Sequence, residues 1–181
     1  MLTRLPAFTP VHGRLVTVRP LAEAEFSQVW AASPGGRDSR AAGRLRQRIR
    51  RSGRLAHGML DLGIDRAGRL IGDIQARHPA HAVPSGVYEL GIRIYRPEDH
   101  GRGYGSDAVQ LLTGWLFERA RAERVQAGTA MTNLAMRRVL ERLGFTLEGV
   151  MRAFMAGPTG REDYALYGVT RSDWQTREHL Y

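Results

Sequence analysis

The stretch HGRGYGSDAV, residues 100–109, has the composition of an anion-binding turn. Three glycines fall within five residues, directly after a run expected to form a strand and directly before one expected to form a helix. Because glycine has no Cβ atom, several main-chain N–H groups can converge there on one ligand, and the helix N-terminus adds partial positive charge. The stretch therefore predicts a site for a phosphate or a similar anion, although a plain tight turn would also explain the glycines.

Other phosphate-binding motifs and several kinds of catalysis are excluded. The chain has no G-x-x-x-x-G-K-[ST] sequence. It also has no G-x-G-x-x-G near its N-terminus with an acidic residue about 20 residues later. It contains no cysteine, which excludes a thiolate nucleophile, a disulfide framework and a cysteine-ligated zinc. The six histidines form no short metal-type cluster, and we expect no metal.

Composition favours one soluble domain with an anionic partner. The 181 residues suit a single domain, residues 1–181. With 27 Lys+Arg residues against 18 Asp+Glu residues, the net charge is +9, which favours a partner such as a phosphorylated cofactor, RNA or a ribosomal surface. No run is apolar and long enough for a secretory signal or a membrane span, so we expect a cytoplasmic protein without membrane contact.

Hydrophobic periodicity predicts alternating strands and helices. The expected strands are residues 14–21, 57–65, 69–77, 87–96, 125–130, 146–155 and 162–170. The expected helices are residues 22–32, 38–52, a helix that starts at Ser106, and a helix from Asn133 that ends at Gly144. This order predicts one α/β or α+β fold with a largely antiparallel sheet.

The segment 37–54 is rich in arginine. Leu45 and Ile49 lie four residues apart within it, which predicts a short basic amphipathic helix. A solvated helix face is the ordinary interpretation of such a charge run. Nucleic-acid contact and a part in the substrate wall are the alternatives.

The run H-G-R-G-Y-G resembles the acetyl-CoA pyrophosphate loop of the GNAT N-acetyltransferases, whose pattern is Q/R-x-x-G-x-G/A. Similarity to the RimJ/RimL branch, which acetylates ribosomal-protein N-termini, extends over five ordered runs: RLVTVRPL, LIGDI, ELGIRIYRPEDHGRGYGSDAV, NLAMRRVLERLGF and DYALYGVTRSDW. The resemblance covers roughly residues 12–174. It implies the GNAT fold, with a mixed, mostly antiparallel central sheet of about seven strands flanked by helices, and an enzyme that uses acetyl-CoA as co-substrate.

The resemblance also implies which residues hold acetyl-CoA. The main chain of Ile92, Arg93 and Ile94 would bind the pantetheine arm, and Asn133 would contact that arm besides capping a helix. Arg138 would lie near a phosphate or the adenine, unless it is a plain surface arginine. The pyrophosphate would rest on the loop formed by His100, Gly101, Arg102, Gly103, Tyr104, Gly105 and Ser106, in which His100 replaces the usual Gln or Arg.

Acetyl transfer from a thioester to an amine needs alignment, stabilisation of an oxyanion and movement of protons, but no covalent enzyme intermediate. Glu89 is the first candidate for the general base, because it lies just before the pantetheine-binding part of the same strand. Alternation places its side chain on the face of Arg93 and Tyr95. A salt bridge with Arg93 or another arginine is the alternative role for Glu89. Glu148 and Glu162 are weaker candidates.

The sequence differs from the family pattern at the positions that would donate a proton to the leaving thiolate. Leu140 stands where many relatives have tyrosine, and Met136 stands where the ribosomal branch often has serine. Neither side chain can donate a proton. Tyr104 is our catalytic candidate, with Tyr164, a water molecule or unassisted departure of the thiolate as alternatives.

The sequence leaves the acceptor amine open. The RimJ/RimL resemblance favours a peptide N-terminus, and a small-molecule amine such as an antibiotic is the alternative. An aminoglycoside would need converging carboxylates, for which the chain offers Asp61, Asp65, Asp73, Glu98, Asp99, Glu148, Glu162 and Asp163. A non-catalytic CoA-binding or RNA-binding module is the second class of function. The family also allows ribosome association and a homodimer formed through sheet edges.

Overall fold

The computed structural model describes residues 7–33, 38–78, 84–157 and 160–178. In these ranges eight strands form one sheet in the order β1-β2-β3-β4-β5-β6-β8-β7, in which only β5 and β6 pair in parallel. The strands are β1 Val11–His12, β2 Thr17–Arg19, β3 Met59–Arg66, β4 Arg69–Arg77, β5 Val87–Ile94, β6 Arg124–Ala130, β7 Thr146–Gly157 and β8 Gly160–Thr170. The expected mixed, mostly antiparallel sheet is confirmed, with eight strands instead of about seven.

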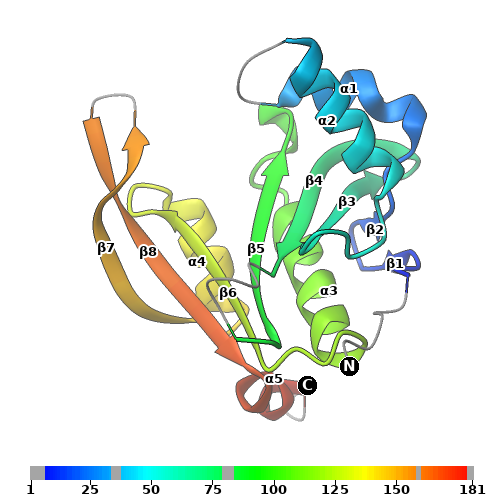
Figure 1. Ribbon diagram of the computed structural model, residues 1–181. Coiled ribbons are helices and arrows are strands. Elements are labelled where there is room, and N and C mark those ends of the chain that lie inside the picture. Colours follow the sequence, from blue (N-terminus) through cyan, green and yellow to red (C-terminus); the bar gives the residue numbers. More distant parts are fainter. Residues whose placement is uncertain (1–6, 34–37, 79–83, 158–159, 179–181) are drawn as a thin grey trace.

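The helices cover both faces of this sheet (Figure 1). They are η1 Glu23–Glu25, α1 Phe26–Ala32, α2 Ser39–Arg50, η2 Pro97–Asp99, α3 Tyr104–Glu118, α4 Leu134–Arg142 and α5 Arg171–Glu178. Helices α3 and α4 pack on one face, and α1 and α2 lie on the other (Figure 1). No helix in the described parts is both long and apolar enough to span a bilayer.

Most sequence-based expectations for the elements are confirmed, and three are wrong in detail. The strand expected at 14–21 shrinks to β2, since Asp107 binds the N–H groups of Leu15 and Val16 outside the sheet. The helix expected from Ser106 begins at Tyr104, because Gly103 already serves as its N-cap. Helix α5 was not expected. The expected connections at 78–86 and 156–160 lie partly outside the described residues. The first residue of the 37–54 segment also lies outside them.

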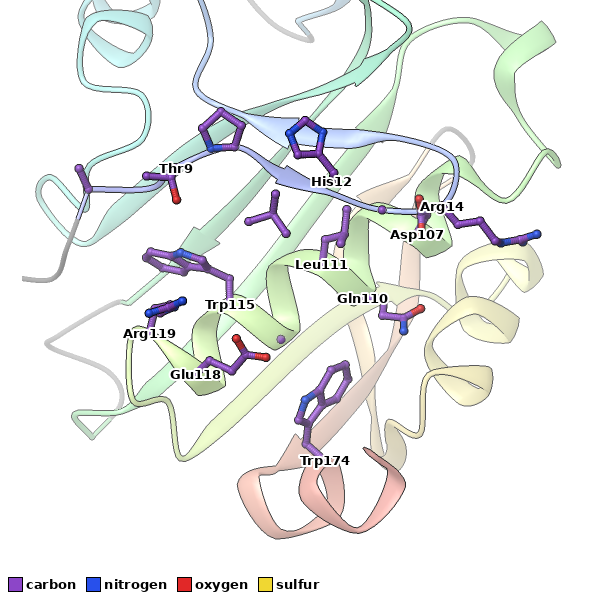
Figure 2. Close-up of a pocket in the computed structure, with 15 residues that line it drawn as sticks. Thr9, His12, Arg14, Asp107, Gln110, Leu111, Trp115, Glu118, Arg119 and Trp174 are labelled. Atoms are coloured by element: carbon purple, nitrogen blue, oxygen red, sulfur yellow. The ribbon is translucent and has the colours of Figure 1, made fainter. Parts of the chain in front are cut away.

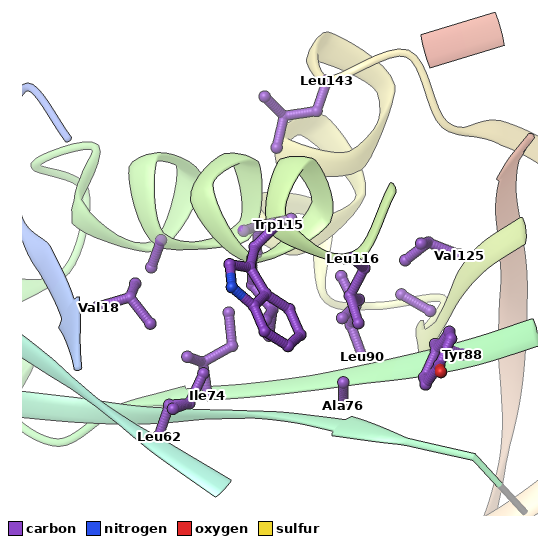
Figure 3. Close-up of a cluster of buried hydrophobic side chains, with 14 of the residues drawn as sticks. Val18, Leu62, Ile74, Ala76, Tyr88, Leu90, Trp115, Leu116, Val125 and Leu143 are labelled. Atoms are coloured by element: carbon purple, nitrogen blue, oxygen red, sulfur yellow. The ribbon is translucent and has the colours of Figure 1, made fainter. Parts of the chain in front are cut away.

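The main core lies between the sheet and helices α3 and α4 (Figure 3). Alternate residues of the central strands, such as Leu62 and Ile74, turn to this face and are fully buried. Leu112 and Leu116 meet them from α3 at helical spacing, with exposed fractions of 0% and 1%. This packing fixes the position of α3, whose N-terminus carries the glycine loop.

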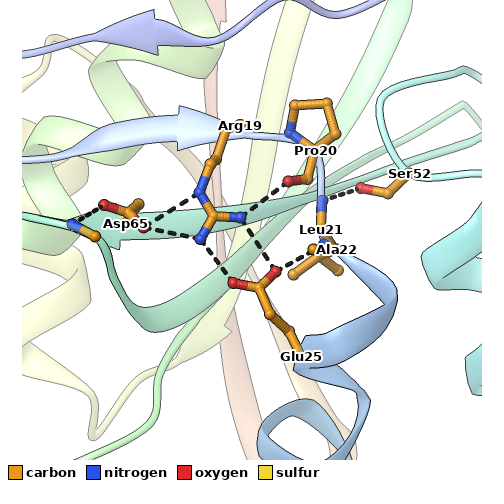
Figure 4. Close-up of polar contacts among 8 residues, drawn as sticks. Arg19, Pro20, Leu21, Ala22, Glu25, Ser52 and Asp65 are labelled. Carbon is orange, nitrogen blue, oxygen red and sulfur yellow. Dashed lines mark hydrogen bonds and ion pairs between the residues drawn. The ribbon is translucent and has the colours of Figure 1, made fainter.

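A cluster of polar side chains on the other face of the sheet connects β2, β3 and η1 (Figure 4). The guanidinium of Arg19 in β2 donates to Asp65 of β3 at 2.8 Å and to Glu25 of η1 at 2.6 Å. Glu25 also accepts the N–H of Ala22 at 2.7 Å, which closes the first turn of η1. The cluster therefore fixes where α1 and α2 start on this face of the sheet.

Candidate active site

Strands β5 and β6 separate part-way along their length. Their parallel register ends at Leu90 and Ala127. Strand β5 stays paired with β4 as far as Ile94, and β6 stays paired with β8 as far as Ala130. The sheet is therefore open between the C-terminal halves of these two strands, and Figure 1 shows them diverging there. We call this feature the β5–β6 opening.

Main-chain groups of β5 face the opening. The N–H of Tyr95 donates to the carbonyl of Ile71 in β4 at 2.9 Å. Because hydrogen-bonded pairs alternate along antiparallel strands, the main chain of Arg93 also turns to β4. The polar groups of Ile92 and Ile94 then turn the other way, into the opening. Of the three expected pantetheine contacts, Ile92 and Ile94 have the required direction, whereas the main chain of Arg93 faces β4.

The loop after β5 leaves a run of main-chain donors free. In the described parts of the chain, the N–H groups of residues 101–106 have no protein acceptor. Gly101 and Gly103 adopt φ angles of 68° and 84°, a left-handed conformation that glycine adopts without strain. Gly103 is also the N-cap of α3 and offers no side chain to its first turn. Free donors and the helix N-terminus together suit a phosphate group.

Side-chain hydrogen bonds hold this loop in place. Asp99 accepts two hydrogen bonds from the guanidinium of Arg69 at the start of β4, at 2.8 and 3.0 Å, and its side chain is only 4% exposed. The Arg69 guanidinium lowers the pKa of the Asp99 carboxyl. The His100 ring lies 3.1 Å from the carbonyl of Ile94, and the Nε of Arg102 donates to the carbonyl of Glu98 at 2.6 Å. The Arg102 side chain therefore folds back along η2.

Glu89 lies on the sheet face opposite α3. The register of β4 and β5 has no bulge, so the expected alternation holds along β5 as far as Ile94. The Glu89 carboxylate pairs with the guanidinium of Arg77, its neighbour on β4, and remains 30% exposed. Gln126 stands opposite Glu89 on β6, one position before the register ends. Glu89 thus borders the opening on this second face.

Arg93 lies on the same face as Glu89, and its side chain and that of Tyr95 are held together by a shared partner. Both side chains bind the same oxygen of Asp73, the guanidinium at 2.5 Å and the phenol at 2.8 Å. Arg93 also donates to the carbonyl of Ala32 at the end of α1, at 2.7 Å. Burial, followed by the neighbouring Asp73 carboxylate, raises the pKa of Tyr95. Helix α1 is therefore tied to the strand that lines the opening.

The candidate tyrosines lie in different places. Tyr104 is 4% exposed within the core on the α3 side, with the Arg66 guanidinium 4.7 Å from its ring centroid. Tyr164 of β8 is half-buried, and its ring would lie 3.7 Å from a Cβ atom placed on Gly128. Gly128 directly follows the last β6 residue that pairs with β5. Tyr164 therefore stands at the mouth of the opening, and its ring meets that of Phe154 at 5.9 Å.

The remaining predicted residues sit on α4. The Oδ1 atom of Asn133 accepts the N–H of Met136 at 3.2 Å, so Asn133 caps α4 as its position suggests. Arg138 is exposed and makes no side-chain hydrogen bond or ion pair with the described residues. Leu140 is fully buried in the main core, and Met136 packs against that core. Neither Met136 nor Leu140 can therefore donate a proton to the opening.

The two weaker base candidates are occupied elsewhere. Glu148 forms a two-pronged ion pair with Arg124, which lowers the pKa of its carboxyl. The Nε of Arg124 also donates to Gln126 at 3.1 Å, so this pair lies beside Gln126 on the face of Glu89. Glu162 packs over Gly157 at the end of the β7–β8 hairpin. Within the described residues, no three His, Asp or Glu side chains gather as a metal site would require.

A separate groove of about 1060 Å³ lies between the N-terminal segment, α3 and α5 (Figure 2). Trp115, Glu118 and Trp174 line it together with His12 and Asp107. None of the predicted site residues is among its lining residues. The groove is therefore distinct from the β5–β6 opening and lies apart from the residues expected to carry the chemistry.

Neither Arg77 nor Arg69 could be singled out from the sequence. Arg77 meets Glu89 only because of the register between β4 and β5, which a long connection separates. Arg69 reaches Asp99 across 30 residues. Both are ordinary arginines in a chain that has many, so their types carried no signal.

Comparison with known proteins identifies the family. Residues 13–146 match the acetyltransferase (GNAT) domain family. The chain belongs to the GNAT acetyltransferases. A probable N-acetyltransferase of Bacillus subtilis strain 168, YjcK, is 31% identical over 74 residues, which are 41% of each protein. The match thus spans less than half the length of that curated relative.

Solved structures agree with the GNAT assignment. A putative acetyltransferase from T. thermophilus is 26% identical, with a TM-score of 0.69 over 98% of this chain and 100% of that one. Mycobacterium smegmatis RimJ in complex with CoA-disulfide has a TM-score of 0.72 over 96% of this chain and 95% of its own. Its identity is only 16%, so it shows the shared fold and does not establish the RimJ/RimL branch.

Proposed function

We propose that this GNAT chain transfers an acetyl group from acetyl-CoA to the N-terminal amine of a peptide that lies on the α1–α2 side of the sheet. One observation carries the proposal. The β5–β6 opening has free main-chain donors at its end, in residues 101–106, and a carboxylate, Glu89, on its second face. A loop with free N–H groups and a carboxylate therefore adjoin the same gap, which supports this proposal.

The free polar groups fit the parts of acetyl-CoA, which supplies the acetyl group as a thioester when bound. Ile92 and Ile94 would hydrogen-bond the pantetheine arm as an adjoining strand does. The N–H groups of residues 101–106 would hold the pyrophosphate. His100 would act through its brace on Ile94. Asn133 and Arg138 would border the arm and the phosphates from α4.

Proton movement would use the face of the opening opposite α3, on which both Glu89 and Tyr164 lie. The Glu89 carboxylate would accept the proton of the acceptor ammonium, directly or through water, while its pair with Arg77 holds it in place. Of the tyrosines, Tyr164 has the better position to donate a proton to the leaving sulfur, because it stands at the mouth of the opening. Tyr104 would serve the loop as a core anchor instead.

Charge on the acceptor side favours a peptide over a polycation. A polyamine or an aminoglycoside would need unpaired carboxylates that converge. Most candidate carboxylates already pair with arginine side chains: Asp61 with Arg48, Asp65 with Arg19, Asp73 with Arg93, Asp99 with Arg69, and Glu148 with Arg124. A peptide N-terminus carries one charge and needs no such pocket. A small neutral amine is the alternative acceptor, and a ribosomal-protein N-terminus is the narrower proposal that the sequence motifs support.

The test is acetyl transfer to a panel of amines. The purified chain is incubated with acetyl-CoA and, separately, with N-terminal peptides, spermidine and an aminoglycoside, while free thiol and acceptor mass are followed. The chain contains no lysine, so its own side chains cannot act as amine acceptors in the assay. We expect thiol release and a mass gain with peptides. Binding of acetyl-CoA without release for any acceptor would contradict an enzymatic role and favour a CoA-binding module.

A further inference from the structure

Helix α2 and the turn after it carry a basic surface that acetyl transfer does not use. Its six arginines are all exposed: Arg40, Arg44, Arg46, Arg50, Arg51 and Arg54. Leu45 and Ile49 turn inward and are 5% and 3% exposed, packed with Leu21, Val29 and Leu70. Because the apolar side of α2 is fixed on the sheet, these arginines are held facing outward. We call them the α2 basic face.

The positive charge of the α2 basic face is not balanced by acidic residues of the same segment. No acidic residue occurs between residues 39 and 60. Asp38 precedes the helix and caps it by accepting the N–H of Ala41 at 2.7 Å. Arg40 and Arg44 stand four residues apart, as do Arg46 and Arg50, and like charges at this spacing destabilise a helix. Burial of the apolar side has to offset this repulsion.

The arginines of this face are free to meet a partner. Arg46 lies over the ring of Phe26 at 4.6 Å, whereas the other five make no side-chain hydrogen bond or ion pair with the described residues. Arg48 shows the contrast within the same helix, because it is half-exposed and paired with Asp61 at 2.5 Å. A solvated structural helix would be expected to neutralise more of its arginines in this way.

From these observations we propose that the α2 basic face binds RNA through its phosphates. Among the described residues, the large exposed apolar side chains are Leu134, Leu147, Val150, Phe154 and Met155, and none lies on α2. The face therefore has nothing to insert into a bilayer. It also has no exposed aromatic ring to stack on bases, so contact is confined to the backbone and is independent of sequence. Since α2 lies flat on the sheet, a pliable RNA strand suits it better than a duplex groove.

The proposed RNA surface and the β5–β6 opening are separate. Helix α2 covers the half of the sheet that contains β3 and β4, as its contacts with Asp61 and Leu70 show (Figure 1). A bound strand would therefore leave the opening accessible. RNA binding in this sense does not depend on the proposed acetyl transfer, and the two can fail independently.

The test compares two double charge reversals in the full chain. One variant carries Arg44→Glu and Arg51→Glu. The matched control carries Arg119→Glu and Arg121→Glu, two exposed arginines at the end of α3, and so has the same net charge. Binding to a fluorescent oligouridylate RNA is measured by anisotropy between about 50 and 200 mM salt. A neutral variant, Arg44→Gln with Arg51→Gln, is measured in parallel, and circular dichroism checks each fold.

We expect the parent and the α3 control to bind the RNA similarly. The α2 reversal should lose at least about tenfold in affinity, with a salt slope lower by about 1.4, since each phosphate contact contributes about 0.7. The RNA affinity of the neutral variant should lie between those of the parent and the α2 reversal. Equal losses in both reversals, no RNA binding by the parent at low salt, equal competition by polyglutamate, or tighter binding to phosphatidylserine vesicles than to RNA would each overturn the proposal.

Discussion

Replacing Glu89 with glutamine tests the assignment of the general base. The substitution keeps the size of the side chain and its place beside Arg77, but a glutamine amide cannot accept the ammonium proton. Loss of a positioned general base lowers rates by about 100- to 10,000-fold. We therefore expect kcat/KM for a peptide acceptor to fall at least about 100-fold, which corresponds to about 2.7 kcal/mol of transition-state stabilisation.

Glu148→Gln provides a matched control. Glu148 and Glu89 are 37% and 30% exposed, each pairs with one arginine, and both lie on the same face of the sheet. Such partly exposed pairs contribute at most about 1 kcal/mol to stability. Both variants should therefore melt within about 4 °C of the parent. Only Glu89→Gln should lose activity, because only Glu89 borders the β5–β6 opening.

The assay is steady-state thiol release with a peptide acceptor between pH 6 and 9, combined with calorimetric measurement of acetyl-CoA affinity. The affinity should be unchanged in both variants, so that the loss appears in turnover. If Glu89→Gln stays within threefold of Glu148→Gln across this pH range, the base is not Glu89. If Glu148→Gln is the variant that loses activity, the base lies on β7 and the assignment moves there.

Three further predictions concern the loop and the core. Gly103→Ala and Gly68→Ala meet the same strain, at φ angles of 84° and 82°, but only Gly103 lies in the loop, where its new Cβ would stand 3.0 Å from a neighbouring side chain. Calorimetry should show weaker acetyl-CoA binding for Gly103→Ala alone, by about 100-fold if two charge-assisted hydrogen bonds of about 1.5 kcal/mol are lost; equal affinities would contradict the loop assignment. The lowered pKa of Asp99 means that its pair stabilises the fold above the ordinary value of 3.8 and that this contribution is lost as the pH falls below it. Asp99→Asn should accordingly unfold more easily in urea at pH 7 and show a flatter dependence of stability on pH between 5 and 2, whereas an unchanged slope would show that Asp99 is not the titrating group. Leu112→Ala, at a fully buried position of α3, should lower the free energy of unfolding by about 2–5 kcal/mol, and a loss under 1 kcal/mol would mean that the core is packed differently.

Local signals explain which elements were predictable. Helix α2 was expected at 38–52 and runs from Ser39 to Arg50, because the spacing of Leu45 and Ile49 acts within one helix. The same logic placed the free donors of residues 101–106 at a strand-to-helix junction. The start of α3 was displaced by two residues because a glycine N-cap looks like part of the loop.

Long-range geometry explains the rest. The partner of Glu89 depends on the register between β4 and β5, and neither strand encodes that register alone. The burial of Tyr104 and the position of Tyr164 depend on which sheet face each element covers, which only the assembled sheet decides. The separation of β5 from β6 is likewise a property of three strand pairings together and has no counterpart in any single run of residues.

The separation of these strands has a mechanical consequence. Four register pairs, ending at Leu90 and Ala127, join the β1–β5 part of the sheet to the β6–β8 part. The hydrogen-bonded seam between the two parts of the sheet is therefore short, and beyond it the two parts are held together through the main core on the α3 side instead of by hydrogen bonds between β5 and β6. A ligand that hydrogen-bonds to Ile92 and Ile94 would lengthen that seam while it is bound. Each turnover would then stiffen the molecule on arrival of the ligand and loosen it on departure.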